Sequence, residues 1–160
     1  MIEVGDRLPQ ATFVVMTGSG PAEKTTDDVF KGRKVALFAV PGAFTPTCHA
    51  NHLPGFLANA DKLRAKGVDA IACVAVNDIF VMDAWSKATG AQGTIEFLAD
   101  GSAAFAKAIG LELDNTARGM GIRSQRYAML VDDGVVKILN LGDAPGKAEI
   151  AGADALLAAM

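Results

Sequence analysis

The strongest constraint on the fold class of this chain comes from two nearly continuous apolar runs, Lys34–Val40 and Asp69–Asn77. Strands buried on both faces show this pattern, and they occur mainly in sheets that helices cover on both sides. Each run is followed by a predicted helix. One extends onward from Thr47, where apolar residues recur at three- and four-residue spacing, and the other starts at Ile79 and is closed by Gly90. The alternation predicts an α/β fold with right-handed crossovers between parallel strands.

Shorter elements flank this pattern. Ala11–Met16 predicts a strand that ends at a glycine-rich turn, residues 94–99 predict a further strand, and residues 102–110 predict a short helix. Pro54 interrupts the helix that follows Thr47. We expect a kink or a break there, because proline removes a backbone hydrogen bond and clashes with the preceding turn.

The last third of the chain predicts a hairpin and a final helix. Residues 126–141 form two apolar stretches around Asp132–Gly134, a strong hairpin turn signal, and the alanine-rich segment Lys147–Met160 predicts a helix. This order of elements is that of a thioredoxin-like α/β fold, a central mixed sheet flanked by helices, with an N-terminal extension. Three residues would form the buried stripe of the last helix: Ile150, Leu156 and Leu157.

Length and composition fit one domain spanning residues 1–160. Hydrophobic residues make up 51% of the 160, enough for a core without a disulfide framework. The formal net charge is −3 and no basic cluster stands out, which argues against a nucleic-acid partner. No apolar run reaches the roughly 20 residues that span a bilayer, and the N-terminus lacks a secretory signal. Two cysteines point to a reducing compartment, so we expect a cytoplasmic location.

The loop after the first apolar run contains one of the two cysteines. It leaves the strand at Val40 and places Cys48 at the start of the next helix. Loops at the carboxyl ends of such strands often carry function. Unpaired N–H groups and the helix dipole favour a thiolate at a helix start. Cys48 could therefore be a nucleophile, half of a metal site, or an inert core cysteine.

Neighbouring residues bear on these alternatives. Thr45 stands three residues before Cys48, where a C-x-x-C disulfide exchanger has its first cysteine, so the loop favours a one-cysteine nucleophile. His49 and His52 suggest a metal, but no second cluster of ligands appears, and we expect none to bind. Cys73 lies within an apolar run and is interpreted as an inert core residue.

The segment VPGAFTPTCHANHLPGF resembles the active-site segment of the peroxiredoxins, through the pattern P-x-x-x-T-x-x-C. It is similar in particular to the type II, or atypical, subfamily. Three later blocks carry the same resemblance at the family's spacing: Val74–Trp85, Phe97–Asp114 and Arg126–Lys137. The fold that the resemblance implies is the thioredoxin-like one already expected.

The resemblance implies a thiol peroxidase that needs no cofactor. Cys48 would attack hydrogen peroxide or an alkyl hydroperoxide and become a sulfenic acid. Thr45 would hydrogen-bond the peroxide and Pro41 would shield the sulfur. Gly42 and His52 would line the substrate site. The family also uses an arginine at the start of a late strand. Arg126 occupies that position, although Arg123 is close in sequence.

Regeneration of Cys48 would need an external thiol. The last 21 residues contain no cysteine, whereas some type II peroxiredoxins carry a resolving cysteine there. Glutathione, with or without glutaredoxin, is the reductant that the resemblance favours, and thioredoxin is the other candidate. The resemblance also implies a homodimer, and Trp85 is expected in the core or in that interface. Two other roles stay open: a non-enzymatic redox sensor or holdase, and a disulfide oxidoreductase.

Overall fold

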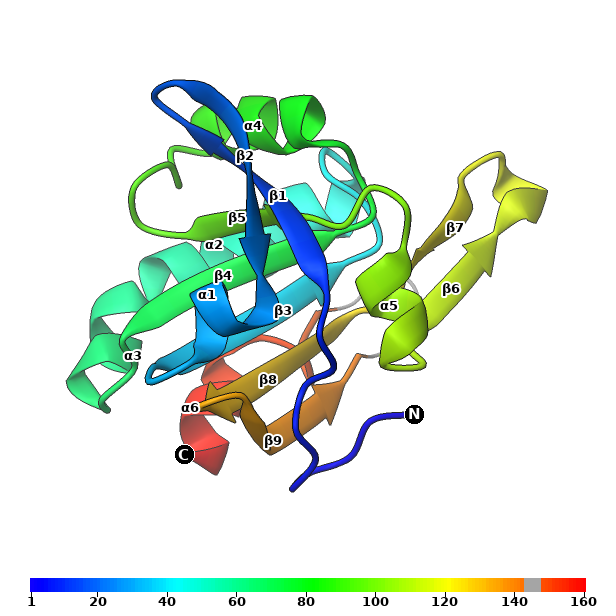
Figure 1. Ribbon diagram of the computed structural model, residues 1–160. Helices are drawn as coiled ribbons and strands as arrows, with labels where there is room; N and C mark the ends of the chain where they lie inside the picture. The colour runs from blue at the N-terminus through cyan, green and yellow to red at the C-terminus, as the bar shows by residue number, and fades with distance from the viewer. Residues whose placement is uncertain (143–147) are drawn as a thin grey trace.

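The computed structural model describes residues 1–142 and 148–160. Within them, seven strands form one mixed sheet in the order β2-β1-β5-β4-β3-β8-β9 (Figure 1). The central strands β5, β4 and β3 run parallel, and β8 pairs antiparallel with β3. The strands of this sheet are β1 (Thr12–Thr17), β2 (Gly20–Thr25), β3 (Lys34–Val40), β4 (Ala70–Ala75), β5 (Glu96–Ala99), β8 (Tyr127–Asp132) and β9 (Val135–Leu141). The predicted α/β fold with a central mixed sheet is confirmed.

Helices cover both faces of this sheet, because the side chains of β3 and β4 are apolar on both sides. Phe38 and Cys73, which pair with each other, lie in the cluster on one face, and their sequence neighbours Leu37 and Val74 lie in the cluster on the other. The first face carries α2 (Leu53–Ala58), α3 (Ala60–Ala65), α4 (Ile79–Ala88) and α6 (Ala153–Ala159), and the second carries α1 (Thr26–Phe30) and α5 (Ala104–Ala108). The residues that follow the carboxyl end of β3 belong to the first face.

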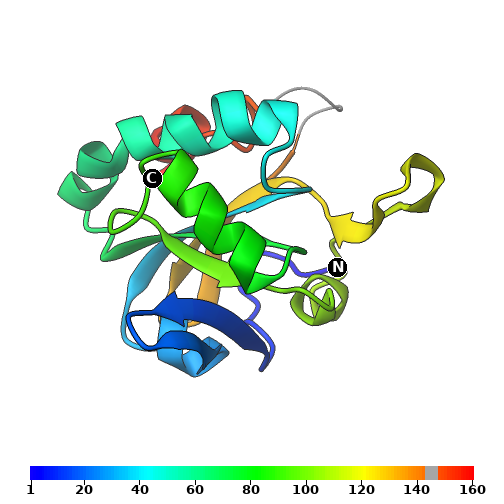
Figure 2. The same cartoon turned by 90° about the horizontal axis from the view of Figure 1, so that it is seen from above.

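Both hairpins of the sheet have tight turns. Asp133 and Gly134 join β8 to β9 with positive φ angles of 48° and 79°, the conformation of the turn expected for this sequence. The pairing of β1 with β2 was not predicted, because β2 is polar and its neighbouring glycines read only as a turn. A second sheet was also missed. Its strands, β6 (Glu112–Asn115) and β7 (Gly121–Ser124), form an arm that projects from the body (Figure 2).

The helices near the site and at the end of the chain differ from the expectation. A π-helical turn, η1 (Cys48–His52), precedes α2, and Pro54 lies in the first turn of α2, where a missing N–H costs little. The helix is interrupted at Asn59, between α2 and α3. The kink or break predicted at Pro54 is therefore wrong in its position. No helix in the described part of the chain is both long and apolar enough to cross a membrane.

The predicted buried stripe of the last helix is partly wrong. Leu156 is fully buried and Leu157 is half-buried, but Ile150 is 54% exposed. Ile150 precedes α6, which begins only at Ala153, so it does not share the helical spacing of the two leucines. Lys147, the predicted start of the helix, lies outside the described residues.

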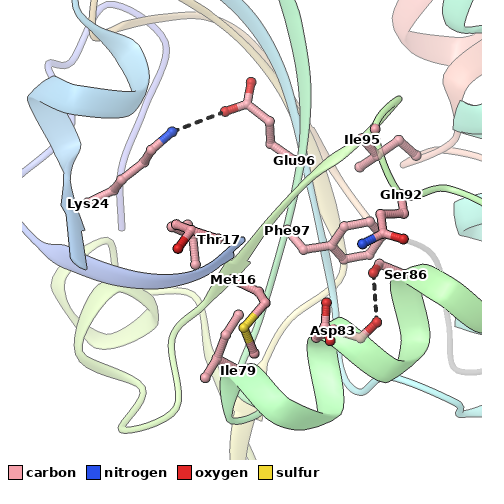
Figure 3. A pocket seen from close by; sticks show the side chains of 12 residues that line it. Met16, Thr17, Lys24, Ile79, Asp83, Ser86, Gln92, Ile95, Glu96 and Phe97 are labelled. Atoms are coloured by element: carbon pink, nitrogen blue, oxygen red, sulfur yellow. Dashed lines mark hydrogen bonds and ion pairs between the residues drawn. The ribbon is translucent and has the colours of Figure 1, made fainter. Parts of the chain in front are cut away.

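A pocket of about 260 Å³ lies between the β1–β2 hairpin, β5 and α4 (Figure 3). Its wall is apolar at Met16, Ile79 and Phe97, and Lys24 and Glu96 approach each other at 4.0 Å on its rim. None of the residues that the sequence pointed to as reactive lines this pocket. The candidate reactive residues Thr45 and Cys48 lie instead in the segment that follows β3.

Candidate active site

Cys48 lies at the start of the π-helical turn that follows the β3 loop. Its side chain is only 1% exposed, and it packs in the apolar cluster on the α2 face of the sheet. The carbonyl of Cys48 accepts the N–H of Leu53, five residues later, which is the bond that defines the wide π turn. Such turns are rare and occur frequently at functional sites. The sulfur is thus held in a largely dry environment.

Arg126 approaches this sulfur from the start of β8, the strand that pairs with β3. Because Tyr127 pairs with Ala39, the residue before β8 lies beside the loop that follows Val40. The Nη2 atom of Arg126 lies 3.1 Å from Cys48 Sγ. A guanidinium at this distance can donate to the sulfur and interacts favourably with negative charge that forms there. The structure therefore brings Arg126 and Cys48 together, as the resemblance implied.

Arg123 takes a different position. Its Nε donates to the carbonyl of Met120 at 2.9 Å and its Nη1 donates to the carbonyl of Val76 at 3.2 Å. The first bond lies within the β6–β7 arm, and the second ties β7 to the turn after β4. Arg123 also lies close to Gly42, where an added Cβ would be 3.4 Å from its Nη1. Of the two arginines considered from the sequence, Arg126 is the one with a bond to the sulfur.

His52 holds Arg126 in place. Its Nδ1 lies 2.8 Å from Arg126 Nη1 and its Nε2 lies 2.6 Å from the carbonyl oxygen of Ala151. A guanidinium can only donate, so Nδ1 is the acceptor and Nε2 carries the proton. Burial lowers the pKa of His52 to about 4, and Arg126 adds to this effect, while the bond to Ala151 opposes it. His52 is therefore neutral at neutral pH and orients the guanidinium.

Thr45 and Gly42 form the other wall of the site. The hydroxyl of Thr45 donates to the carbonyl of Gly42 at 2.6 Å. Its only proton is thereby engaged, so its oxygen can still accept a hydrogen bond from a bound molecule. A side chain at Gly42 would lie 3.0 Å from the Thr45 methyl group, which explains the glycine. Pro41 directly follows β3 and is half-buried, and its shielding of the sulfur stays a prediction.

An aromatic contact next to Cys48 escaped the sequence reasoning. Trp85 was expected in the core or in a dimer interface, and it is fully buried in the core. Its indole N–H donates to Nδ1 of His49 at 3.0 Å. The Phe44 ring stacks on His49 with centroids 5.8 Å apart. Trp85 lies on α4, and no local pattern in the sequence relates that helix to the residue after Cys48.

Cys73 is fully buried in β4, which agrees with its interpretation as a core residue. Burial raises the pKa of its thiol well above the usual value, and the neighbouring Cys48 adds to the shift. Both cysteines are free thiols in the same apolar cluster. Among residues 1–142 and 148–160, no group of three or more His, Cys, Asp or Glu side chains is placed to hold a metal ion.

A buried cysteine on a thioredoxin-like sheet, with an arginine at its sulfur, defines a thiol-based redox protein of the redoxin class. The sequence profile of the Redoxin family matches residues 3–157. The chain is 44% identical over 160 residues to peroxiredoxin-2C of Oryza sativa, covering 99% of this chain and 98% of the relative. The chain therefore belongs to the peroxiredoxin family, in agreement with the resemblance seen in the sequence.

Two further comparisons extend this result. The chain is 50% identical over 144 residues to the chloroplastic peroxiredoxin-2E of Arabidopsis thaliana, which covers 88% of this chain but only 62% of that relative's length. The crystal structure of reduced Prx3 in complex with hydrogen peroxide from Vibrio vulnificus is 53% identical. It superposes with a TM-score of 0.94 and covers 99% of each chain.

Proposed function

We propose that this chain is a thiol peroxidase that reduces hydrogen peroxide and organic hydroperoxides to water and alcohols. The single observation that carries the proposal is the contact of Arg126 with the buried sulfur of Cys48 at 3.1 Å. A thiolate is the nucleophile in cysteine chemistry, and a fixed cation beside it stabilises that form. The solved relative with bound hydrogen peroxide supports the choice of substrate.

The site residues have separate tasks in this reaction. The Cys48 thiolate attacks one peroxide oxygen, the O–O bond breaks, and a sulfenic acid and an alkoxide or hydroxide form. The departing oxygen takes up a proton and leaves as alcohol or water. Arg126 donates toward the charge that develops in this step, and the Thr45 oxygen accepts the peroxide O–H. Gly42 leaves room for the peroxide beside Thr45, and Pro41 keeps water from the sulfur.

An external thiol completes the cycle with Cys48 as the only reacting cysteine. A first thiol condenses with the sulfenic acid, which releases water and leaves a mixed disulfide, and a second thiol frees Cys48 as a disulfide departs. Glutathione with glutaredoxin is the proposed reductant, with thioredoxin as the other candidate. We also propose a homodimer in the cytoplasm. The burial of Cys73 and the raised pKa of its thiol support the one-cysteine cycle.

Peroxide consumption by the purified chain tests this function. The wild type and Cys48→Ser are supplied with hydrogen peroxide or tert-butyl hydroperoxide, and with a glutathione–glutaredoxin or a thioredoxin system. We expect many turnovers for the wild type and none for Cys48→Ser, with unchanged circular dichroism. Consumption of a single equivalent of peroxide by the wild type with every reductant would instead indicate a redox sensor. Turnover by Cys48→Ser would exclude Cys48 as the nucleophile.

A further inference from the structure

The peptide group between Gly42 and Ala43 makes two hydrogen bonds in opposite directions. Its carbonyl accepts the Thr45 hydroxyl at 2.6 Å, and its N–H donates to Oδ1 of Asn77 at 2.9 Å. A peptide group is planar, so a bond that fixes the direction of its N–H also fixes that of its carbonyl. The side chain of Asn77 therefore determines where the acceptor of the Thr45 proton lies.

This loop needs such a support. Phe44 has a φ angle of 62°, in the left-handed region that residues other than glycine rarely adopt. The backbone bond that closes the turn, from the Thr45 N–H to the Gly42 carbonyl, is long at 3.4 Å. A strained turn persists where surrounding structure holds it. The bond from Asn77 to Ala43 supports the turn in this way, and it comes from the turn that follows another strand, β4.

Asn77 is itself held on both sides. The carbonyl of Val76, directly before it, accepts Arg123 Nη1 at 3.2 Å. The carboxylate of Asp78, directly after it, accepts the N–H of Val81 and begins α4. The half-buried amide thus projects from a fixed turn between β4 and α4 toward the loop of Cys48.

We infer that Asn77 is a positioning residue for peroxide attack at Cys48, an inference that rests on the proposed function. By fixing the Gly42–Ala43 peptide, Asn77 keeps the Thr45 proton directed at Gly42. The Thr45 oxygen then presents its lone pairs to the peroxide. Without this hold, the Thr45 hydroxyl can turn away from Gly42. Its oxygen then no longer presents its lone pairs to the peroxide, and the peroxide is left unoriented beside an otherwise unchanged sulfur.

Two rates on the same variants test the inference. We compare Asn77→Leu, which has no acceptor, with Asn77→Asp, which keeps the oxygen. Asn59→Leu serves as the matched control, because it loses one side-chain bond, of 2.8 Å to the Gly55 carbonyl, away from the loop. Stopped-flow measures oxidation of Cys48 by hydrogen peroxide, and iodoacetamide measures thiolate reactivity without peroxide.

For Asn77→Leu we expect peroxide oxidation at least about tenfold slower and alkylation within about threefold of the wild type. For Asn77→Asp, the ratio of the two rates should stay near the wild-type value, since its charge affects both reactions. Combining Asn77→Leu with Thr45→Val should cost little more than Thr45→Val alone, because both act through one hydroxyl.

Three results would overturn the inference: an unchanged peroxide rate in Asn77→Leu, an equal fall of both rates, or fully additive effects with Thr45→Val. A peroxide rate in Asn59→Leu as low as in Asn77→Leu would also overturn it, since the effect would then not be specific to the loop. The wild-type rate is measured first. A wild type that does not react with peroxide would reject the proposed function itself, whatever the variants do.

Discussion

Arg126 and Cys48 are 78 positions apart in the sequence, yet a guanidinium nitrogen of one lies 3.1 Å from the sulfur of the other. The antiparallel pairing of β8 with β3 creates this contact, because it sets Tyr127 opposite Ala39 at the edge where the Cys48 loop begins. A sheet register thereby determines the charge beside the nucleophile.

Arg126→Met should slow oxidation of Cys48 by hydrogen peroxide by a factor of about 10²–10³, typical for loss of one transition-state donor. Alkylation by iodoacetamide at neutral pH should also slow, because the thiolate loses its neighbouring charge. This joint effect distinguishes Arg126 from Asn77. Arg123→Met is the matched control and should leave alkylation nearly unchanged. A larger effect of Arg123→Met on alkylation would show that the wrong arginine has been assigned to the sulfur.

The buried, neutral His52 predicts a pH dependence of stability. Its pKa in the folded chain is about 4, against 6.5 as the ordinary value, so the unfolded chain binds more protons between these limits. The free energy of unfolding should therefore fall as the pH falls from about 6.5 to about 4, by up to about 3 kcal/mol from this residue.

Urea unfolding of the wild type and His52→Leu at several pH values measures this contribution. Carboxylates also titrate near the lower limit, so the difference between the two proteins isolates His52. The variant should lose less stability than the wild type across the window. Parallel curves for the two proteins would show that His52 is not held neutral.

Gly142 packs directly against the backbone of Arg126. A Cβ on Gly142 would lie 2.5 Å from the Arg126 carbonyl oxygen and 2.8 Å from its Cβ, and the N–H of Gly142 donates to that same oxygen at 2.7 Å. Gly142→Ala should therefore displace Arg126, lower the free energy of unfolding by about 1–3 kcal/mol, and slow peroxide reduction.

Gly55→Ala provides the comparison for this substitution. Gly55 lies within α2 and an added Cβ would meet no atom within 4 Å, so alanine there should stabilise the chain by about 0.5–1 kcal/mol. Thermal unfolding and the peroxide rate are measured on both variants. Equal effects of the two alanines would contradict the tight packing of Gly142 on Arg126.

Local patterns in the sequence predicted much of the fold and the site. The apolar runs predicted β3 and β4, and the motif around Cys48 pointed to Thr45, whereas Arg126 was implied by the family resemblance. Patterns of this kind describe neighbours along the chain. The polar strand β2 and the β6–β7 arm carry no apolar periodicity, and the bonds of Asn77 to Ala43 and of Trp85 to His49 join residues 34 and 36 positions apart. Only the folded sheet brings such partners together.

The last prediction concerns Cys73. It shares the apolar cluster of Cys48, so position alone does not separate the two thiols, but burial raises its pKa and keeps it protonated. A disulfide forms through a thiolate and needs Cα atoms within about 7 Å with suitable side-chain directions. With one equivalent of peroxide, Cys48 should persist as sulfenic acid, or appear as a mixed disulfide when glutathione is present. Non-reducing intact-mass spectrometry distinguishes these products.

Cys73→Ser should accordingly turn over with an external thiol at nearly the wild-type rate, after correction for the folded fraction. Cys73→Ala is the second variant, because a serine hydroxyl buried in β4 can itself destabilise the sheet. If peroxide produced a Cys48–Cys73 disulfide as fast as the catalytic cycle, Cys73 would be a resolving cysteine. The raised pKa of its thiol would then belong only to the reduced, closed conformation, and β4 would have to open during each cycle.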